Sequence, residues 1–240
     1  MKKQILISAI CIALIGKTGS SQNLNNLINQ GSNFLNGSGQ TVSNDEVVKG
    51  LKEALTIGTN NSTTAAAKPD GYFKNSLIKI PFPPDAKKMD TELRKIGMGK
   101  DVDKFVMTLN RGAEEAAKSA APIFIAAVTG MTITDGISLL KGGDNAATNY
   151  LKDKTSAELQ VKFKPIIQAA LKKVEITKYW NPLVKSYNKI PFVEKVNPNL
   201  DDYCTSKAIE GLFKLIAGEE LKIRKDPAAR VTDLLKKIFG

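Results

Sequence analysis

DVDKFVMTLNRGAEEAA, the sequence of Asp101–Ala117, is the stretch that decides the fold. Its apolar residues recur every three or four positions, which is the spacing of one face of an α-helix. The polar residues Asn110, Arg111 and Glu114 are spaced so that they share one face of the same helix. The apolar face consists of Val102, Phe105, Val106, Leu109, Ala113 and Ala116.

The helical pattern continues toward the N-terminus. Ser43 and Glu46 have the spacing of a capping box, which predicts that a helix begins there. Gly58, Asn60 and Asn61 follow within the same periodic stretch, and we expect this helix to weaken at them because glycine and asparagine are poor helix formers.

The pattern also continues toward the C-terminus, where helix start signals follow one another. Thr132 or Thr134 is expected to cap a short helix that stops at Gly142-Gly143. Ile123–Val128 is apolar enough to be fully buried, a long helix is expected to begin near Asp201, and Asp226-Pro227 is a strong start signal.

Between these elements we expect two helices in succession. The first starts at Asp144 and runs to Asp153. The second is capped by Thr155 or Ser156, and Pro165 should kink or restart it because proline removes a backbone donor.

The summed pattern predicts an all-α multi-helix bundle of roughly ten helices. One element could depart from it, because Lys79-Ile80-Pro81-Phe82 is repeated as Lys189-Ile190-Pro191-Phe192. Each copy is extended before its proline, so the two could pair as a tiny two-stranded β ribbon. Chance recurrence is the alternative, and the sequence does not separate the two.

The N-terminus is typical of a secretory signal. Lys2 and Lys3 precede an apolar run from Ile5 to Ile15, which is too short to span a bilayer. A short buried helix is the alternative. We expect a signal peptide over 1–21, a flexible Asn/Gly/Ser-rich tether over 22–42 and a single helical domain over 43–240. The mature chain would be periplasmic or extracellular, without a transmembrane span.

Composition excludes several kinds of site. The chain has no histidine, which removes Ser-His and Cys-His nucleophile pairs and imidazole metal ligands. Cys204 is the one cysteine left after the signal, so no internal disulfide can form. No alternating acidic loop for calcium is seen. We therefore predict no metal, no cofactor and no catalytic residue.

The chain is basic, with a formal net charge of +11 at pH 7. Removing the three lysines of the predicted signal leaves +8, which favours weak attraction to anionic surfaces such as lipid headgroups. Nucleic acid is not an expected partner, because the lysines are spread over many helices and aromatics make up only 6%.

Several stretches occur in an order and spacing that resemble the bacterial family called domain of unknown function 4197. They are Asp70–Phe73, Ile80–Pro83, Asn110–Glu114, Gly142–Tyr150, Lys154–Ser156, Phe163–Ile166 and Pro227–Gly240. The resemblance covers Ser43 to Gly240 and implies an exported helical protein, without an established activity or ligand. Gly112 and Val231 depart from the family pattern, where alanine and threonine are usual.

Two features could carry binding. Gly142-Gly143-Asp144 precedes a helix start, where free backbone N–H groups attract anions, although the Asp144 carboxylate could satisfy those donors itself. Arg111 is one of four arginines in a chain dominated by lysine, which indicates planar two-point pairing. It could form an ion pair between helices, for example with Asp144 or Asp233.

The alternative is a polar pocket in which Arg111 and Arg230 hold an anionic group and other side chains add hydrogen bonds. The candidate ligand-binding residues are Asn110, Arg111, Glu114, Asp144, Thr148, Tyr150 and Arg230. Adjacent carboxylates such as Glu219 and Glu220 point about 100° apart on a helix, so we expect them to be solvated and not an acid/base pair.

Three functions remain open from the sequence. The first is a non-enzymatic exported domain that binds a small anionic or amphipathic ligand or a cell-envelope partner. The second is a hydrolase-like enzyme that uses carboxylates, with Glu114 or Asp144 as the base. The third is a purely structural envelope module.

Overall fold

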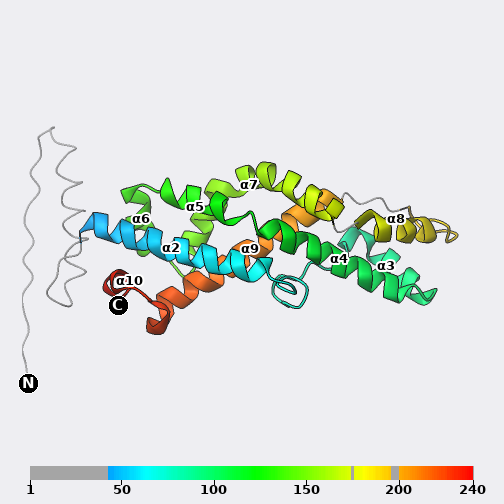
Figure 1. Cartoon of the computed structure of the whole chain (residues 1–240), viewed down its shortest axis with the longest axis horizontal. Coiled ribbons are helices and arrows are strands. Elements are labelled where there is room, and N and C mark those ends of the chain that lie inside the picture. The colour runs from blue at the N-terminus through cyan, green and yellow to red at the C-terminus, as the bar shows by residue number, and fades with distance from the viewer. Residues whose placement is uncertain (1–42, 174–175, 196–199, 240) are drawn as a thin grey trace, which may run out of the picture. The chain divides into compact units, whose positions relative to one another are not determined.

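The structure, a computed structural model, describes residues 43–173, 176–195 and 200–239. Its elements in this part of the chain are nine α-helices and two short 3-10 turns (Figure 1). In order they are α2 (Asn44–Ala67), η1 (Pro84–Ala86), α3 (Lys87–Lys95), α4 (Gly99–Ala117), α5 (Ala121–Thr129), α6 (Ile133–Leu140), α7 (Ala146–Lys173), α8 (Ile176–Tyr187), α9 (Leu200–Lys225), η2 (Pro227–Ala229) and α10 (Asp233–Phe239). The all-α prediction is confirmed.

The predicted signal peptide and tether lie outside the described residues. Of the described helices, none is by itself both long and apolar enough to cross a membrane. The pair α5 and α6 meets that length and composition only when taken together, and it is bent by 105°.

The core lies where α9 packs against α7, α2 and α4. Figure 1 shows α9 crossing the domain next to these longer helices. The stretch quoted first, now α4, buries Phe105 and Leu109 completely, and α9 buries Ala208 and Leu212. Each large apolar side chain removed from water stabilises the fold by about 1.5–3 kcal/mol, so these faces determine how the helices pack.

Local start signals are confirmed where they depend on neighbouring residues. Thr132 caps α6: its hydroxyl accepts a hydrogen bond from the Asp135 backbone N–H, and the Asp135 carboxylate accepts one from the Thr132 N–H. Asp226 caps η2 by accepting a hydrogen bond from the Ala228 N–H at 2.9 Å. The long helix predicted near Asp201 is α9.

The predicted weakening after Gly58 is wrong, because α2 is one helix of 24 residues. A Cβ atom at Gly58 would lie 3.2 Å from the Cβ of Glu219, so the glycine lets α9 approach closely. Asn61 donates a hydrogen bond to Glu219 at 2.8 Å. Packing against α9 therefore outweighs the poor helix propensity of this stretch.

The two helices predicted between Asp144 and Lys173 are a single helix, α7, of 28 residues that begins at Ala146. The Thr155 and Ser156 hydroxyls do not cap a new helix. They donate hydrogen bonds to the backbone carbonyls of Leu151 and Lys152, one turn earlier. Pro165 also lies inside this helix.

Two further expectations fail. Within Ile123–Val128 only Phe124 and Val128 are fully buried, since α5 covers the core with one face. The described residues contain no β-strand, so the ribbon is absent there. The Ile80 N–H donates to the Asn110 side-chain oxygen at 2.8 Å and the Asn110 amide donates to the Ile80 carbonyl at 2.7 Å, so a side chain takes the place of a partner strand.

Candidate functional site

The polar face of α4 meets the turn that follows α2. The Glu114 side chain is buried, with 4% of the residue exposed. One of its oxygens accepts hydrogen bonds from the Tyr72 and Phe73 backbone N–H groups, each at 3.1 Å. The other accepts one from Arg111 at 2.6 Å. This carboxylate is therefore fully engaged inside the fold.

Arg111 uses its second nitrogen on Asp70, at 2.5 Å, and Lys74 also pairs with Asp70 at 2.8 Å. Hydrogen bonds from Lys74 and then Arg111 lower the pKa of Asp70. The predicted partners Asp144 and Asp233 were wrong. We call Asp70, Arg111 and Glu114 the Arg111 cluster; it fastens the turn after α2 onto α4.

The second cluster joins α9 to the N-terminus of α7. Glu220, which was expected to be solvated, is only 7% exposed. Its oxygens accept hydrogen bonds from the backbone N–H groups of Ala147 and Thr148, at 3.0 and 2.8 Å, and from the Thr148 hydroxyl. The expected anion position at this helix start is thus occupied by an internal carboxylate, and Asp144 is not what fills it.

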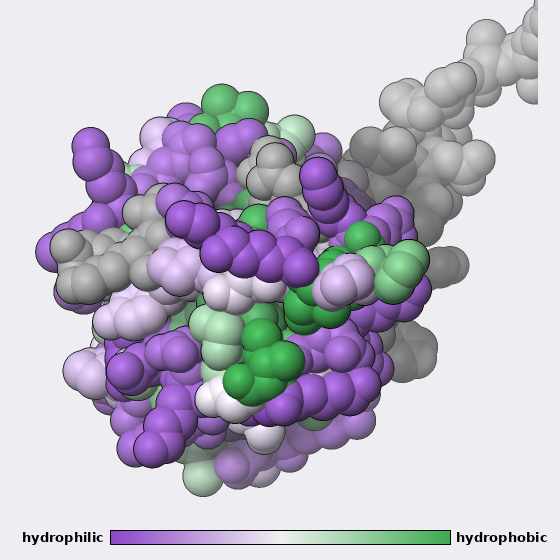
Figure 2. Space-filling model, turned by 90° about the vertical axis from the view of Figure 1, so that its right-hand side faces the viewer, coloured by the Kyte–Doolittle hydropathy of each residue, from purple (hydrophilic) through white to green (hydrophobic). Residues whose placement is uncertain are grey.

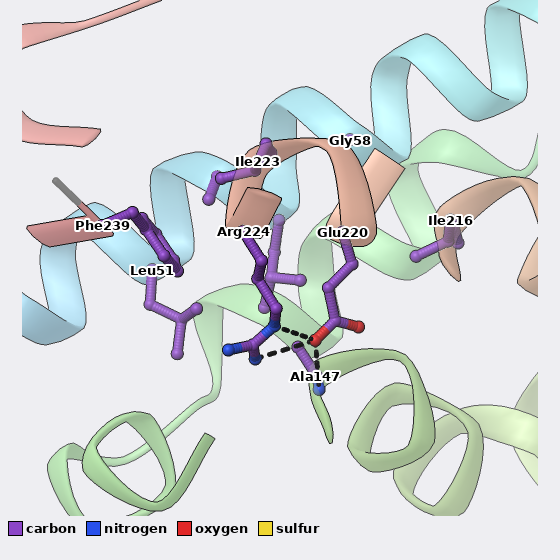
Figure 3. Close-up of a pocket in the computed structure, with 10 residues that line it drawn as sticks. Leu51, Gly58, Ala147, Ile216, Glu220, Ile223, Arg224 and Phe239 are labelled. Carbon is purple, nitrogen blue, oxygen red and sulfur yellow. Dashed lines mark hydrogen bonds and ion pairs between the residues drawn. The ribbon is translucent and has the colours of Figure 1, made fainter. Parts of the chain in front are cut away.

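Arg224 completes this Glu220 cluster, which we define as Thr148, Glu220 and Arg224. The guanidinium pairs with Glu220 at 2.8 Å and also donates to the Leu139 carbonyl at the end of α6 (Figure 3). Apolar residues of α2, α9 and α10, such as Leu51 and Ile223, line the small cavity beside it. The cavity has room for about one water molecule, so it is not a ligand site.

The remaining predicted residues lie apart from one another. Asp144 is exposed and pairs with Lys225 at 2.7 Å. The Tyr150 hydroxyl donates to Asp135 at 3.1 Å. Arg230 donates to the carbonyls of Ile223 and Arg224 at the end of α9. The structure brings Asn110, Arg111 and Glu114 together, and it does not gather the seven residues into one pocket.

A groove of about 560 Å³ lies between α7 and α9, and Thr148 is at its margin. α7 contributes a stripe of polar side chains: Asn145, Asn149, Lys152, Ser156 and Gln160. α9 contributes the apolar Ile209, Phe213 and Ala217 at intervals of one turn, flanked by Ser206, Glu210 and Lys214. The groove therefore has a polar wall and an apolar floor.

Sequence reasoning missed this groove. Its polar stripe on α7 has the pattern of an ordinary solvated helix face. The apolar positions Ile209 and Phe213 belong to a helix whose other face fills the core, and the Phe213 ring packs edge-on against Phe124 with centroids 5.5 Å apart. Only the pairing of the two helices shows that the stripes face one space.

The charges of the groove are two lysines and one carboxylate. Glu210 accepts hydrogen bonds from Lys207 and Lys214, and these lower its pKa to about 2. Lys152 has no acidic partner in the described part of the chain. In that same part, no group of three or more Cys, Asp or Glu side chains is placed to hold a metal ion.

Comparison with known proteins places these features in one family. The family model described as "Protein of unknown function (DUF4197)" matches residues 41–240. No curated protein and no solved structure matches the chain. Both polar clusters and the α7–α9 groove fall within the matched residues.

Proposed function

Because the chain belongs to the DUF4197 family, whose description states no function, we propose a function from the geometry: an exported, non-enzymatic binding domain. Its site is the groove between α7 and α9, and its ligand is a small amphipathic molecule that carries an acidic group. The observation that carries the proposal is the unused polar wall of this groove opposite an apolar floor.

The chemistry of the two walls defines the ligand class. Ile209, Phe213 and Ala217 offer apolar surface to a hydrocarbon or ring. Lys152 and Lys214, on opposite helices, are suited to a carboxylate or sulfate. The amides of α7 can donate and accept hydrogen bonds. The volume lies within the roughly 300–1,000 Å³ of ordinary small-molecule sites.

An enzyme that uses carboxylates is the second candidate, and the geometry gives it less support. Glu114 and Glu220 are both occupied by backbone N–H groups and an arginine. Glu210, the one carboxylate in the groove, has its pKa lowered to about 2 by two lysines, so it is a weak base and is not protonated near neutral pH. The third candidate, a structural envelope module, predicts an empty groove.

The test is to purify the mature protein from its own host without denaturation and weigh it intact. We expect an added mass from a retained small molecule. Ser156→Trp fills the groove and should remove it, whereas Ala157→Trp, on the neighbouring exposed position outside the groove, should keep it. A ligand retained by both variants, or by neither the wild type nor the variants, contradicts the proposal.

The export part of the proposal has its own measurement. The chain begins with the features of a secretory signal, and cleavage near Ser21–Gln22 would leave Gln22 as the first residue. Peptide mass spectrometry of the protein from its host should find that N-terminus. An intact Met1 on all of the protein contradicts export through a cleaved signal.

A further inference from the structure

The two copies of Lys-Ile-Pro-Phe have opposite fates. Phe82, in the first copy, packs against Phe105 and Trp180, with ring centroids 5.2 and 5.9 Å away. Phe192, in the second copy, lies in the turn after α8 and is 107% exposed, more than any other large hydrophobic side chain in the described residues. An aromatic ring held fully in water is the opposite of what burial favours.

The backbone at Phe192 is also unusual. Its φ is +64°, the left-handed region that a bulky L-residue rarely adopts. Such strain is concentrated at functional positions, where the surrounding chain imposes it. Here Pro191 fixes the preceding residue and the turn projects the ring away from the domain.

A second exposed apolar residue lies at the same end of the domain. Figure 1 shows that the turn after α8 and the corner between α3 and α4 lie at this end, and α3 packs against α8. Ile96, in that corner, is 54% exposed. Figure 2 faces this end and shows hydrophobic side chains near its middle, with hydrophilic ones around them.

The same segments carry exposed lysines without an acidic partner in the described part of the chain. They are Lys100, Lys185, Lys189 and Lys195. The unpaired carboxylates there are Asp101 and Glu194, so positive charge predominates. Arg94 is already neutralised by Asp90 and Asp103.

We propose that this end of the domain, the Phe192 tip, is a peripheral contact for an anionic lipid surface. Phe192 and Ile96 would enter the boundary between headgroups and acyl chains, and the lysines would lie at the headgroups. A protruding ring and one isoleucine are too little for a stable protein partner, which needs about 1,000 Å² of buried surface. The tip is distinct from the groove, so this inference does not rest on the proposed ligand.

The test is co-sedimentation of the full protein with vesicles of equal parts phosphatidylcholine and phosphatidylglycerol. Phe192→Ser should lower the partition coefficient by roughly tenfold to a hundredfold, because a Phe side chain no longer leaves water. The matched control is Val161→Ser, which removes a 74% exposed apolar side chain on α7 and should bind as the wild type does. Both sites are exposed, so both variants should keep the wild-type circular dichroism spectrum.

A second readout uses Phe192→Trp. The chain has one natural tryptophan, Trp180, which is buried. With anionic vesicles the added indole should shift its emission to the blue and be quenched by brominated acyl chains, and high salt should weaken this. The proposal is overturned if Phe192→Ser binds as well as the wild type, if Val161→Ser loses as much, or if the wild type ignores the vesicles. It is also overturned if Phe192→Ser abolishes self-association in the absence of lipid.

Discussion

Arg111 shows how one side chain can suggest a ligand site and serve the fold. Its residue type correctly indicated two-point pairing, because a guanidinium has the planar donor geometry that matches carboxylates. Its partners could not be read from the sequence: Asp70 is 41 positions away and comes close only through the turn after α2. Both guanidinium contacts are internal, with Glu114 and Asp70.

Arg111→Ala should therefore lower the free energy of unfolding by about 2 kcal/mol. The substitution leaves the buried Glu114 carboxylate without its charged partner, and the third of the Arg111 side chain that is exposed reduces the effect through solvent screening. Arg94→Ala, at an exposed pair with Asp90, is the control and should cost less than about 1 kcal/mol. Urea unfolding measures both; equal effects contradict a structural role for Arg111.

Glu210 gives a pH dependence of known sign. Hydrogen bonds from Lys207 and Lys214 lower its pKa from 4.5 to about 2, so the ionised group stabilises the folded state above pH 4.5 and loses this contribution as the pH falls toward 2. The stability difference between the wild type and Glu210→Gln should shrink over that range. Thermal unfolding at a series of pH values measures it, and a constant difference would contradict the assignment.

At the scale of elements, the sequence predicts a helix boundary well when its determinants are neighbours. The Thr132–Asp135 capping box is such a case. The start of α7 is not, because the carboxylate that accepts its first N–H groups belongs to Glu220, 72 and 73 positions later. Gly112 is similar: a Cβ atom there would lie 2.5 Å from a Leu171 methyl carbon, so this glycine lets α4 pack closely on α7.

Glu220→Ala should destabilise the junction of α6, α7 and α9 strongly. It leaves Arg224 buried without its partner and frees two backbone donors, for an expected loss of about 3–5 kcal/mol. The neighbouring Glu219→Ala removes a contact with Lys222 at the surface and should cost about 1 kcal/mol or less. Chemical denaturation of both variants measures this; similar losses would show that the Glu220 cluster is not the junction's main polar contact.

At the scale of the whole molecule, helical periodicity was enough to predict the all-α fold, because it is a property of each segment alone. The groove could not be predicted in this way. Its walls, around Ser156 and Phe213, belong to helices whose pairing depends on the packing of the entire core. The polar groups that attracted attention in the sequence are mostly engaged inside the fold, and the groups left free are ordinary amides and lysines.

The central claim is that the Arg111 cluster is structural and the groove binds the ligand. Its most direct test is a titration of the isotope-labelled protein with dodecanoate, an amphipathic carboxylate, followed by backbone amide chemical shifts in NMR. We expect saturable shifts at groove residues such as Asn149, Lys152, Phe213 and Lys214, and none at Tyr72 or Arg111. Shifts that centre on Tyr72 and Arg111 and spare α7 and α9 would contradict the account.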